Sequence, residues 1–263
     1  MINSSDEKAA FLPVSVREFF LEVDGISRFT GRFFKTVVKP PYEFSEILKQ
    51  SFIIGYKSLG LVTVTGFIMG LVLTIQSRPT LARFGAESWL PGMVAISIIR
   101  EIGPVITALI CAGKVGSGIG AELASMNVTE QIDAMEVSGM NPFKYLVVTR
   151  VLAAVLMIPL LVIYADAVGL FGSYIGVNIL GDVGLRLYFS QAVEHLDFVD
   201  VLPAFIKTFF FGFVIGIIAC YKGYTSDKGT EGVGIAANSA VVIGSLGVFI
   251  LDMIAVQLTS FFM

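Results

Sequence analysis

Five long apolar stretches divide the sequence, and each is long enough to cross a lipid bilayer as a helix. They lie at residues 52–76, 90–114, 146–176, 201–221 and 237–261. A helix needs roughly 20 apolar residues to cross about 30 Å of hydrocarbon. The apolar runs are continuous rather than alternating, which disfavours a membrane β-barrel. The sequence therefore predicts an all-α membrane protein with five transmembrane helices.

Composition agrees with this fold class and excludes several functions. The chain is 55% hydrophobic and 15% charged, whereas soluble domains are roughly 45–50% apolar and about a quarter charged. The net charge of −3 gives no overall positive field for nucleic acid. Cys111 and Cys220 both lie in apolar stretches without metal-ligand neighbours, and we expect them to be small buried hydrophobic residues. The sequence therefore predicts no metal site.

The segment before the first apolar stretch has a different pattern. Residues 1–12 read as a polar tail, and an amphipathic helix is predicted from Arg17 to Val38, before Pro40. Its apolar face is made by Phe19, Val23, Ile26, Phe33 and Val37, and its polar face by Arg17, Asp24, Arg28 and Lys35. This pattern predicts a helix lying in the membrane interface; the alternative is a soluble helix packed on a partner. We expect residues 1–41 to form this region and residues 42–263 the five-span domain.

Lysine and arginine residues predict the orientation in the membrane, because they are enriched in cytoplasmic segments. With the N-terminus inside, the inner segments hold Lys8, Arg17, Arg28, Arg32, Lys35, Lys39, Lys49, Lys114, Lys144, Arg150, Lys222 and Lys228. The outer loops hold only Arg78, Arg83 and Arg186. We therefore expect a cytoplasmic N-terminus, a C-terminus on the outer side of the membrane and a cytoplasmic loop over residues 115–145.

That loop reads as a short helix of its own. Asn127 followed by Glu130 fits the pattern of a helix N-cap with an acidic third residue, and Gly139 is a predicted stop. Val128, Ile132 and Met135 fall on one face of the helix over residues 127–138, and Glu130 and Asp133 fall on the other. The apolar face is expected to pack on the ends of the spans and the acidic face to point into the cytoplasm. A simple solvated loop helix is the alternative.

Charged residues also occur inside the apolar stretches. Arg100 and Glu101 interrupt the second stretch, and Lys207 in the fourth is their natural partner. Such charges cost about 2.5–3.5 kcal/mol each on insertion scales and are usually paired or functional. Asp166 and Asp252 have no obvious partner in the sequence. A structural ion-pair network and a role in gating both remain open.

The sequence carries no readable catalytic motif. "AGKVGSGIGAE" contains Gly-Lys, but a phosphate loop requires an earlier glycine where Ala108 stands and Ser or Thr where Val115 stands. His195, the single histidine, falls in a predicted outer loop, so no nucleophile–base pair is evident. We expect no catalytic residues and no cofactor.

Residues 100–142, "REIGPVITALICAGKVGSGIGAELASMNVTEQIDAMEVSGMNP", resemble the signature of the MlaE/YrbE permease family. "GFIMGLVLTIQ" resembles the family's first span, and "FIKTFFFGFVIGIIACYKGYTSDKGTEGVGIAANSAVV" its fourth span and last cytoplasmic loop. These permeases belong to MCE-type ABC transporters, which move phospholipids between the inner and outer membranes of Gram-negative bacteria.

The resemblance implies a homodimer in the bacterial inner membrane, with a phospholipid cavity between the protomers. It also implies a cytoplasmic ABC ATPase that binds the ATP, a periplasmic MCE-domain protein and, in some systems, a STAS-domain protein. The family fold has an N-terminal interfacial helix, five spans and a coupling helix between spans two and three. Carried over by motif, the residues at the ATPase contact are Glu122, Thr129, Glu130, Gln131, Asp133 and Met135. Arg100, Glu101 and Lys207 match the family's intramembrane charges.

Two other classes of function compete with this interpretation. One is a membrane scaffold or channel without an ATPase. The other is an ion-coupled secondary carrier that uses Glu101 and Lys207. Dependence of transport on ATP or on the proton gradient distinguishes the carrier from the ABC permease.

Overall fold

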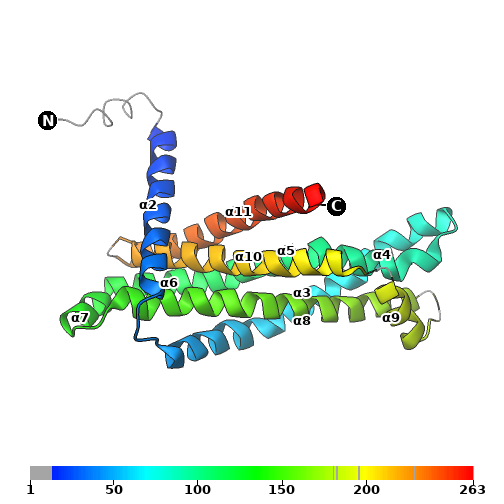
Figure 1. The fold of residues 1–263 in the computed structure, drawn as a ribbon, viewed down its shortest axis with the longest axis horizontal. Coiled ribbons are helices and arrows are strands. Elements are labelled where there is room, and N and C mark those ends of the chain that lie inside the picture. The colour runs from blue at the N-terminus through cyan, green and yellow to red at the C-terminus, as the bar shows by residue number, and fades with distance from the viewer. Residues whose placement is uncertain (1–13, 180, 182, 195, 228, 263) are drawn as a thin grey trace. The chain divides into compact units, whose positions relative to one another are not determined.

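A computed structural model of the protein describes residues 14–179, 181, 183–194, 196–227 and 229–262. The predicted polar tail and His195 lie outside these residues. Throughout the described ranges the structure is helical and has no strand (Figure 1). The chain divides into two compact units, Met1–Tyr42 and Glu43–Met263.

The first unit contains one long helix, α2 (Val14–Val37). An amphipathic helix was expected from Arg17 to Val38, and α2 confirms the helix. Asp24 and Arg28, one turn apart, form an exposed ion pair with 2.8 Å between Oδ2 and Nη2. The helix ends shortly before Pro40, whose ring prevents continuation. Its place in the membrane interface stays a prediction.

The second unit contains five helical stretches that are long and apolar enough to cross a membrane. They are Phe44–Arg83, Glu87–Val128, Phe143–Asn178, Val201–Tyr224 and Thr230–Phe261. Each contains one of the predicted spans and extends it at one or both ends. The fold class, an all-α membrane protein with five spans, is therefore confirmed.

Two π-helical turns, η2 and η3, interrupt the second stretch, and a third, η4, begins the third stretch. Two short helices, α7 and α9, lie between spans. The elements are α3 (Phe44–Arg83), η1 (Glu87–Trp89), α4 (Leu90–Ser97), η2 (Ile98–Ile102), α5 (Gly103–Cys111), η3 (Ala112–Gly116), α6 (Ser117–Val128), α7 (Gln131–Val137), η4 (Phe143–Val148), α8 (Thr149–Asn178), α9 (Leu185–Glu194), α10 (Phe198–Tyr224) and α11 (Thr230–Phe262).

The π-helical turns mark places where the second span departs from regular α-helix. η2 holds both predicted charges of this span, Arg100 and Glu101, and Pro104 follows it directly in α5. Proline has no N–H and cannot complete the preceding turn, so a wider turn before it accommodates the lost hydrogen bond. π-helical turns are rare and occur frequently at functional sites.

Helix α8 is the most buried of the five spans, and its small residues let two neighbours approach it closely. On the α3 side, a Cβ atom at Gly70 would lie 1.8 Å from the carbonyl oxygen of Gly169, so only glycine fits there. On the α10 side, a Cβ at Gly212 would lie 2.7 Å from the carbonyl oxygen of Ala154. Small residues at such contacts replace the hydrophobic driving force that is missing between helices in lipid.

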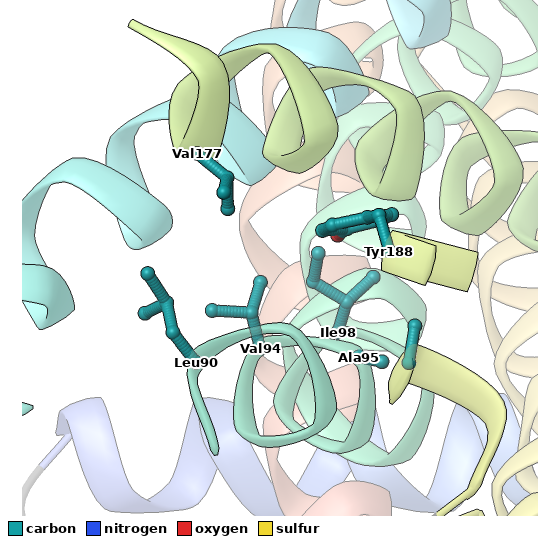
Figure 2. Packing of buried hydrophobic residues seen from close by; sticks show 7 residues of the cluster. Leu90, Val94, Ala95, Ile98, Val177 and Tyr188 are labelled. Carbon is teal, nitrogen blue, oxygen red and sulfur yellow. The ribbon is translucent and has the colours of Figure 1, made fainter. Parts of the chain in front are cut away.

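At the end of the unit far from α7, the helix α9 covers α4 (Figures 1 and 2). Tyr188 and Ala192, one turn apart on α9, are fully buried in an apolar cluster with Val94 and Ile98. The segment between the third and fourth spans was expected to be a loop, and α9 corrects this expectation. The spacing of Tyr188 and Ala192 puts both side chains on one helical face. This face packs against the first turns of the second span.

The packing of α3 on α8 predicts a sharp difference between two glycine substitutions in α3. Gly70→Ala forces the two backbones apart and should lower stability by about 1–3 kcal/mol. Gly60→Ala adds a methyl group where no atom lies within 4 Å, so it should cost nothing. The measurement is thermal unfolding of the purified protein in detergent. Equal unfolding temperatures for the two variants would contradict the close approach.

Candidate functional site

The loop between the second and third candidate spans contains most of the residues predicted to contact a partner. α6 continues through the expected start of the loop helix, and α7 begins only at Gln131. The predicted N-cap at Asn127, with Glu130 as third residue, is therefore wrong. Glu130 instead directly precedes α7 in a left-handed conformation, with φ of 56°. This unusual φ allows the chain to turn sharply between the two helices.

Two side chains account for the corrected helix boundary. Thr129 Oγ1 donates to the carbonyl oxygen of Ser125 at 2.8 Å, which supports the end of α6. Asn127 Nδ2 donates at 2.8 Å to the carbonyl oxygen of Ser226, in the segment after α10. Asn127 therefore joins the last turn of α6 to the segment after α10 instead of capping a helix.

Helix α7 has an apolar and an acidic face as predicted, but Val128 of the predicted apolar face lies at the end of α6. Ile132 is buried and Met135 is partly buried, whereas Glu130, Asp133 and Glu136 are exposed. The short helix is thus fixed to the unit through its apolar side. Its acidic side, with three carboxylates within seven residues, faces outward and has no basic residue between them.

Two more of the predicted contact residues, Thr129 and Gln131, lie just before and at the start of α7. Thr129 and Gln131 are both exposed, and Gln131 Nε2 donates to Thr129 Oγ1 at 3.0 Å. Gly139 follows the helix with φ of 79°, which confirms the predicted stop. All the family-derived contact residues except Glu122 therefore gather on α7 and on the turn before it. Their role in binding a partner stays a prediction.

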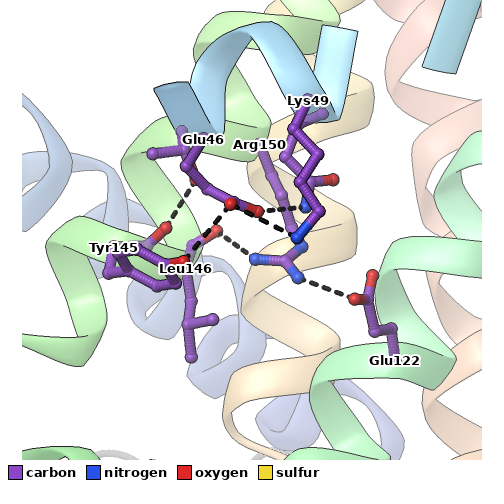
Figure 3. A network of polar contacts seen from close by, with 8 residues as sticks. Glu46, Lys49, Glu122, Tyr145, Leu146 and Arg150 are labelled. Carbon is purple, nitrogen blue, oxygen red and sulfur yellow. Dashed lines mark hydrogen bonds and ion pairs between the residues drawn. The ribbon is translucent and has the colours of Figure 1, made fainter. Parts of the chain in front are cut away.

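Glu122 lies elsewhere, on α6, and faces the start of the third span (Figure 3). Its Oε1 accepts from Arg150 Nη2 at 2.9 Å. Arg150 is 2% exposed, whereas the Glu122 side chain is about half exposed, at 52%. Arg150 Nη1 also donates to the carbonyl oxygen of Leu146 at 3.0 Å. Arg150 is thus a buried partner of Glu122. In the sequence it was considered only as one of the positive charges that predict the orientation in the membrane.

The first turns of α3 join the same polar network (Figure 3). Glu46 Oε1 accepts from Gln50 Nε2 at 2.8 Å, and Glu46 Oε2 accepts from Tyr145 OH at 3.2 Å. Lys49 Nζ lies 3.5 Å from Glu46 Oε2. Tyr145 is in η4, one turn before Arg150, so the network connects α3, α6 and the start of the third span. The contact between Glu46 and Tyr145 could not be predicted from the sequence, because 99 residues separate them.

A second charged cluster lies inside the spans, where the sequence predicted an ion pair. Lys207 Nζ on α10 lies 2.6 Å from Glu101 Oε2 on η2, as expected. It also lies 2.9 Å from Asp252 Oδ1 on α11. Asp252 was expected to have no obvious partner, and the structure corrects this. The buried lysine thus joins three helical segments and faces two carboxylates.

Two other charged residues of the spans are Arg100 and Asp166. Arg100 is in the same π-helical turn as Glu101 and is partly exposed. Asp166 on α8 lines a cavity of about 300 Å³ whose other lining residues are apolar, including Pro104 and Phe205. Its Oδ1 is buried and has no hydrogen-bond partner within the described ranges. Within the part of the chain that the structure describes, no group of three or more His, Cys, Asp or Glu side chains could hold a metal ion.

The lysine cluster predicts unequal effects of removing its members. Lys207→Met leaves Glu101 and Asp252 facing each other without a cation, and breaking a buried ion pair in this way costs about 3–5 kcal/mol. Glu101→Gln leaves Lys207 paired with Asp252 and should cost less. Adding Glu101→Gln and Asp252→Asn to Lys207→Met should recover part of the loss, because no unpaired charge then remains. Thermal unfolding in detergent measures these variants together with Asp252→Asn alone. A triple variant that loses the sum of the three single losses would contradict the coupling.

The comparisons with known proteins point to one family. Residues 47–258 match the family described as permease MlaE. A relative in Rickettsia prowazekii, named a probable ABC transporter permease protein, is 41% identical over 242 residues, which cover 92% of this chain and 93% of the relative. A probable ABC transporter permease protein of Synechocystis is 34% identical over 221 residues, which cover 84% of each chain.

A chloroplast protein extends the likeness beyond bacteria. Protein TRIGALACTOSYLDIACYLGLYCEROL 1 of Arabidopsis thaliana is 34% identical over 232 residues, which cover 88% of this chain and 65% of the relative. The five spans, the polar loop after the second span and the match over most of the chain agree with one another. The chain therefore belongs to the MlaE permease family.

Proposed function

We propose that the protein is the permease subunit of an ABC transporter that moves phospholipids between the inner and outer membranes of a bacterium. A separate cytoplasmic ATPase supplies the energy, and it binds the surface formed by α7 and the turn before it. The permease itself holds no nucleotide and carries no catalytic residue. The single observation that carries the proposal is α7, a short helix fixed to the spans by its apolar side with its acidic side outward.

The permease role rests on the family and on its relatives. The matched family is described as a permease, and the relatives in Rickettsia prowazekii and Synechocystis are named ABC transporter permease proteins. A permease of this type needs an ATPase partner, because the chain has no phosphate-loop motif of its own. Five candidate spans support a multi-pass membrane protein.

The lipid substrate rests on the family resemblance and on one relative. The name of the Arabidopsis relative contains the name of a galactolipid, a diacylglycerol derivative. The resemblance adds a homodimer with the lipid cavity between protomers, a periplasmic MCE-domain partner and, in some systems, a STAS-domain partner. The excess of Lys and Arg in alternate loops supports a cytoplasmic N-terminus and a periplasmic C-terminus.

The charged residues inside the spans favour a second candidate function, an ion-coupled carrier. Lys207 with its two carboxylates, and Asp166 in its apolar cavity, are groups that an ion pathway uses. This candidate requires transport to stop when the proton gradient is dissipated while ATP is kept constant. The ABC permease instead requires transport to continue under that condition and to stop when ATP is removed.

Charge reversal on α7 tests the proposal directly. In the double variant Glu130→Lys and Asp133→Lys, Ile132 and Met135 still hold the helix on the spans, so the permease should insert normally. Like charges at an interface cost several kcal/mol, and every ~1.4 kcal/mol lowers affinity tenfold. We therefore expect at least a tenfold loss of ATPase recovered with the tagged permease, and loss of ATP-dependent lipid transport in reconstituted vesicles.

A matched control reverses two exposed acidic residues at the other end of the unit. Glu87→Lys with Glu194→Lys changes the net charge by the same amount, and both positions are exposed. This control should keep the ATPase. Equal ATPase recovery from both double variants would show that α7 is not the binding surface, and the interpretation of α7 as a simple loop helix would then stand.

A further inference from the structure

We infer that the ion pair between Glu122 and Arg150 transmits movement of the α6–α7 loop to the membrane helices, so that it couples ATP hydrolysis to transport. The inference rests on the proposed function, because it assumes an ATPase bound at α7. It assigns to Arg150 the role of a positioning residue, and it takes Glu122 out of the contact surface where the family resemblance put it.

The ion pair between Glu122 and Arg150 joins the two ends of the chain segment that contains α7. Glu122 precedes the loop on α6, Arg150 follows it at the start of α8, and 28 residues separate them in sequence. The guanidinium is held at two points, by Glu122 Oε1 at 2.9 Å and by the carbonyl oxygen of Leu146 at 3.0 Å. Arginine presents its donors in a rigid planar fork, so two contacts fix its direction as well as its distance. The two ends of the loop are therefore held together as one body.

The chain between the loop and α8 contains an irregular helical turn, and the ion pair connects α6 to α8 independently of that turn. η4 (Phe143–Val148) lies between the loop and α8, and it is a π-helical turn. Such turns are less regular than α-helix and are associated with bends, so a displacement entering at α7 can be absorbed there. Arg150 lies in α8, beyond the π-helical turn, and connects directly to α6. Movement of α6 therefore reaches α8 without passing through η4.

The same position distributes movement to the first span. Thr149 Oγ1, beside Arg150, donates to the carbonyl oxygen of Tyr145 at 2.6 Å, and Tyr145 OH donates to Glu46 on α3 at 3.2 Å (Figure 3). α8 is also the span that packs closely on both α3 and α10. A shift of α8 thus acts on both neighbours, which is what opening or closing a path between spans requires.

A role in stability alone makes a different prediction, because buried ion pairs are poor stabilisers. Replacing both partners with apolar side chains of similar volume is often neutral or stabilising, whereas removing one partner leaves a buried charge. The double variant Glu122→Met with Arg150→Met should therefore fold. It retains volume at the contact but lacks the directional bonds, so it separates positioning from packing.

The experiment uses the permease co-purified with its ATPase and reconstituted in liposomes, with fluorescently labelled phosphatidylethanolamine as the transport probe. Three quantities are measured for each variant: ATPase recovered per permease, ATP hydrolysed and lipid moved. For Glu122→Met with Arg150→Met we expect ATPase recovery and ATP hydrolysis within twofold of wild type, and lipid moved per ATP lowered at least fivefold. Glu122→Gln, which keeps an oxygen acceptor for Arg150 but not the charge, should give a smaller loss of the same ratio.

The exposed pair of Asp24 and Arg28 supplies the control, since both residues belong to one helix, α2. Asp24→Asn with Arg28→Gln removes an ion pair that joins no two elements, and it should leave the ratio of lipid to ATP unchanged. An unchanged ratio in the Glu122 and Arg150 double variant would overturn the inference, as would loss of the ATPase from that variant. If the wild-type permease fails to recover any ATPase, the proposed function itself fails, and this is visible before any variant is compared.

Discussion

The close packing of α8 against α3 and α10 is the constraint on which the rest of the second unit depends. A bilayer supplies no hydrophobic force between helices, so contact must come from backbones that approach closely. Gly70 and Gly212 provide that approach, because a side chain at either position would overlap a carbonyl oxygen of α8. The polar residues that α8 carries, Arg150 near one end and Asp166 farther along, are therefore held in fixed relation to the neighbouring helices.

Two charged clusters follow from this arrangement, and they differ in what they connect. Lys207 joins the second, fourth and fifth spans through Glu101 and Asp252. Arg150 joins the second and third spans at the base of the α7 loop. Each buried cation therefore holds together segments that the chain itself connects only through long stretches. On the proposed function, the cluster around Lys207 holds the bundle together, and the cluster around Arg150 transmits movement of the α7 loop to the spans.

Much of the fold follows from the sequence because hydropathy is a local property. Each of the five spans was predicted from a long, mostly apolar run, which can be recognised without knowledge of its neighbours. The faces of α7 followed in the same way from the periodicity of Ile132, Met135 and Asp133. The pairing of Glu101 with Lys207 was predictable because few charges interrupt the apolar runs, so the choice of partners was small.

The missed features depend on contacts between distant segments. Asn127 has the residue type of a helix N-cap, but its side chain bonds to Ser226, so α6 continues past the predicted start of the loop helix. Asp252 had no partner in the sequence because the depth of one span relative to another is set by packing. Glu122 and Arg150 flank the loop with opposite charges, and that symmetry was the available signal for their pairing. The helix α9 was missed because only ten residues form it.

On the proposed function, α7 is the surface through which an ATPase acts on the membrane helices. A photo-crosslinking amino acid at position 134, on the exposed part of α7, tests this contact in intact cells. We expect a covalent product between the permease and the ATPase from position 134, and none from position 87 at the other end of the unit. A transporting complex that gives no product from position 134, or equal products from both positions, would show that the ATPase does not bind at α7.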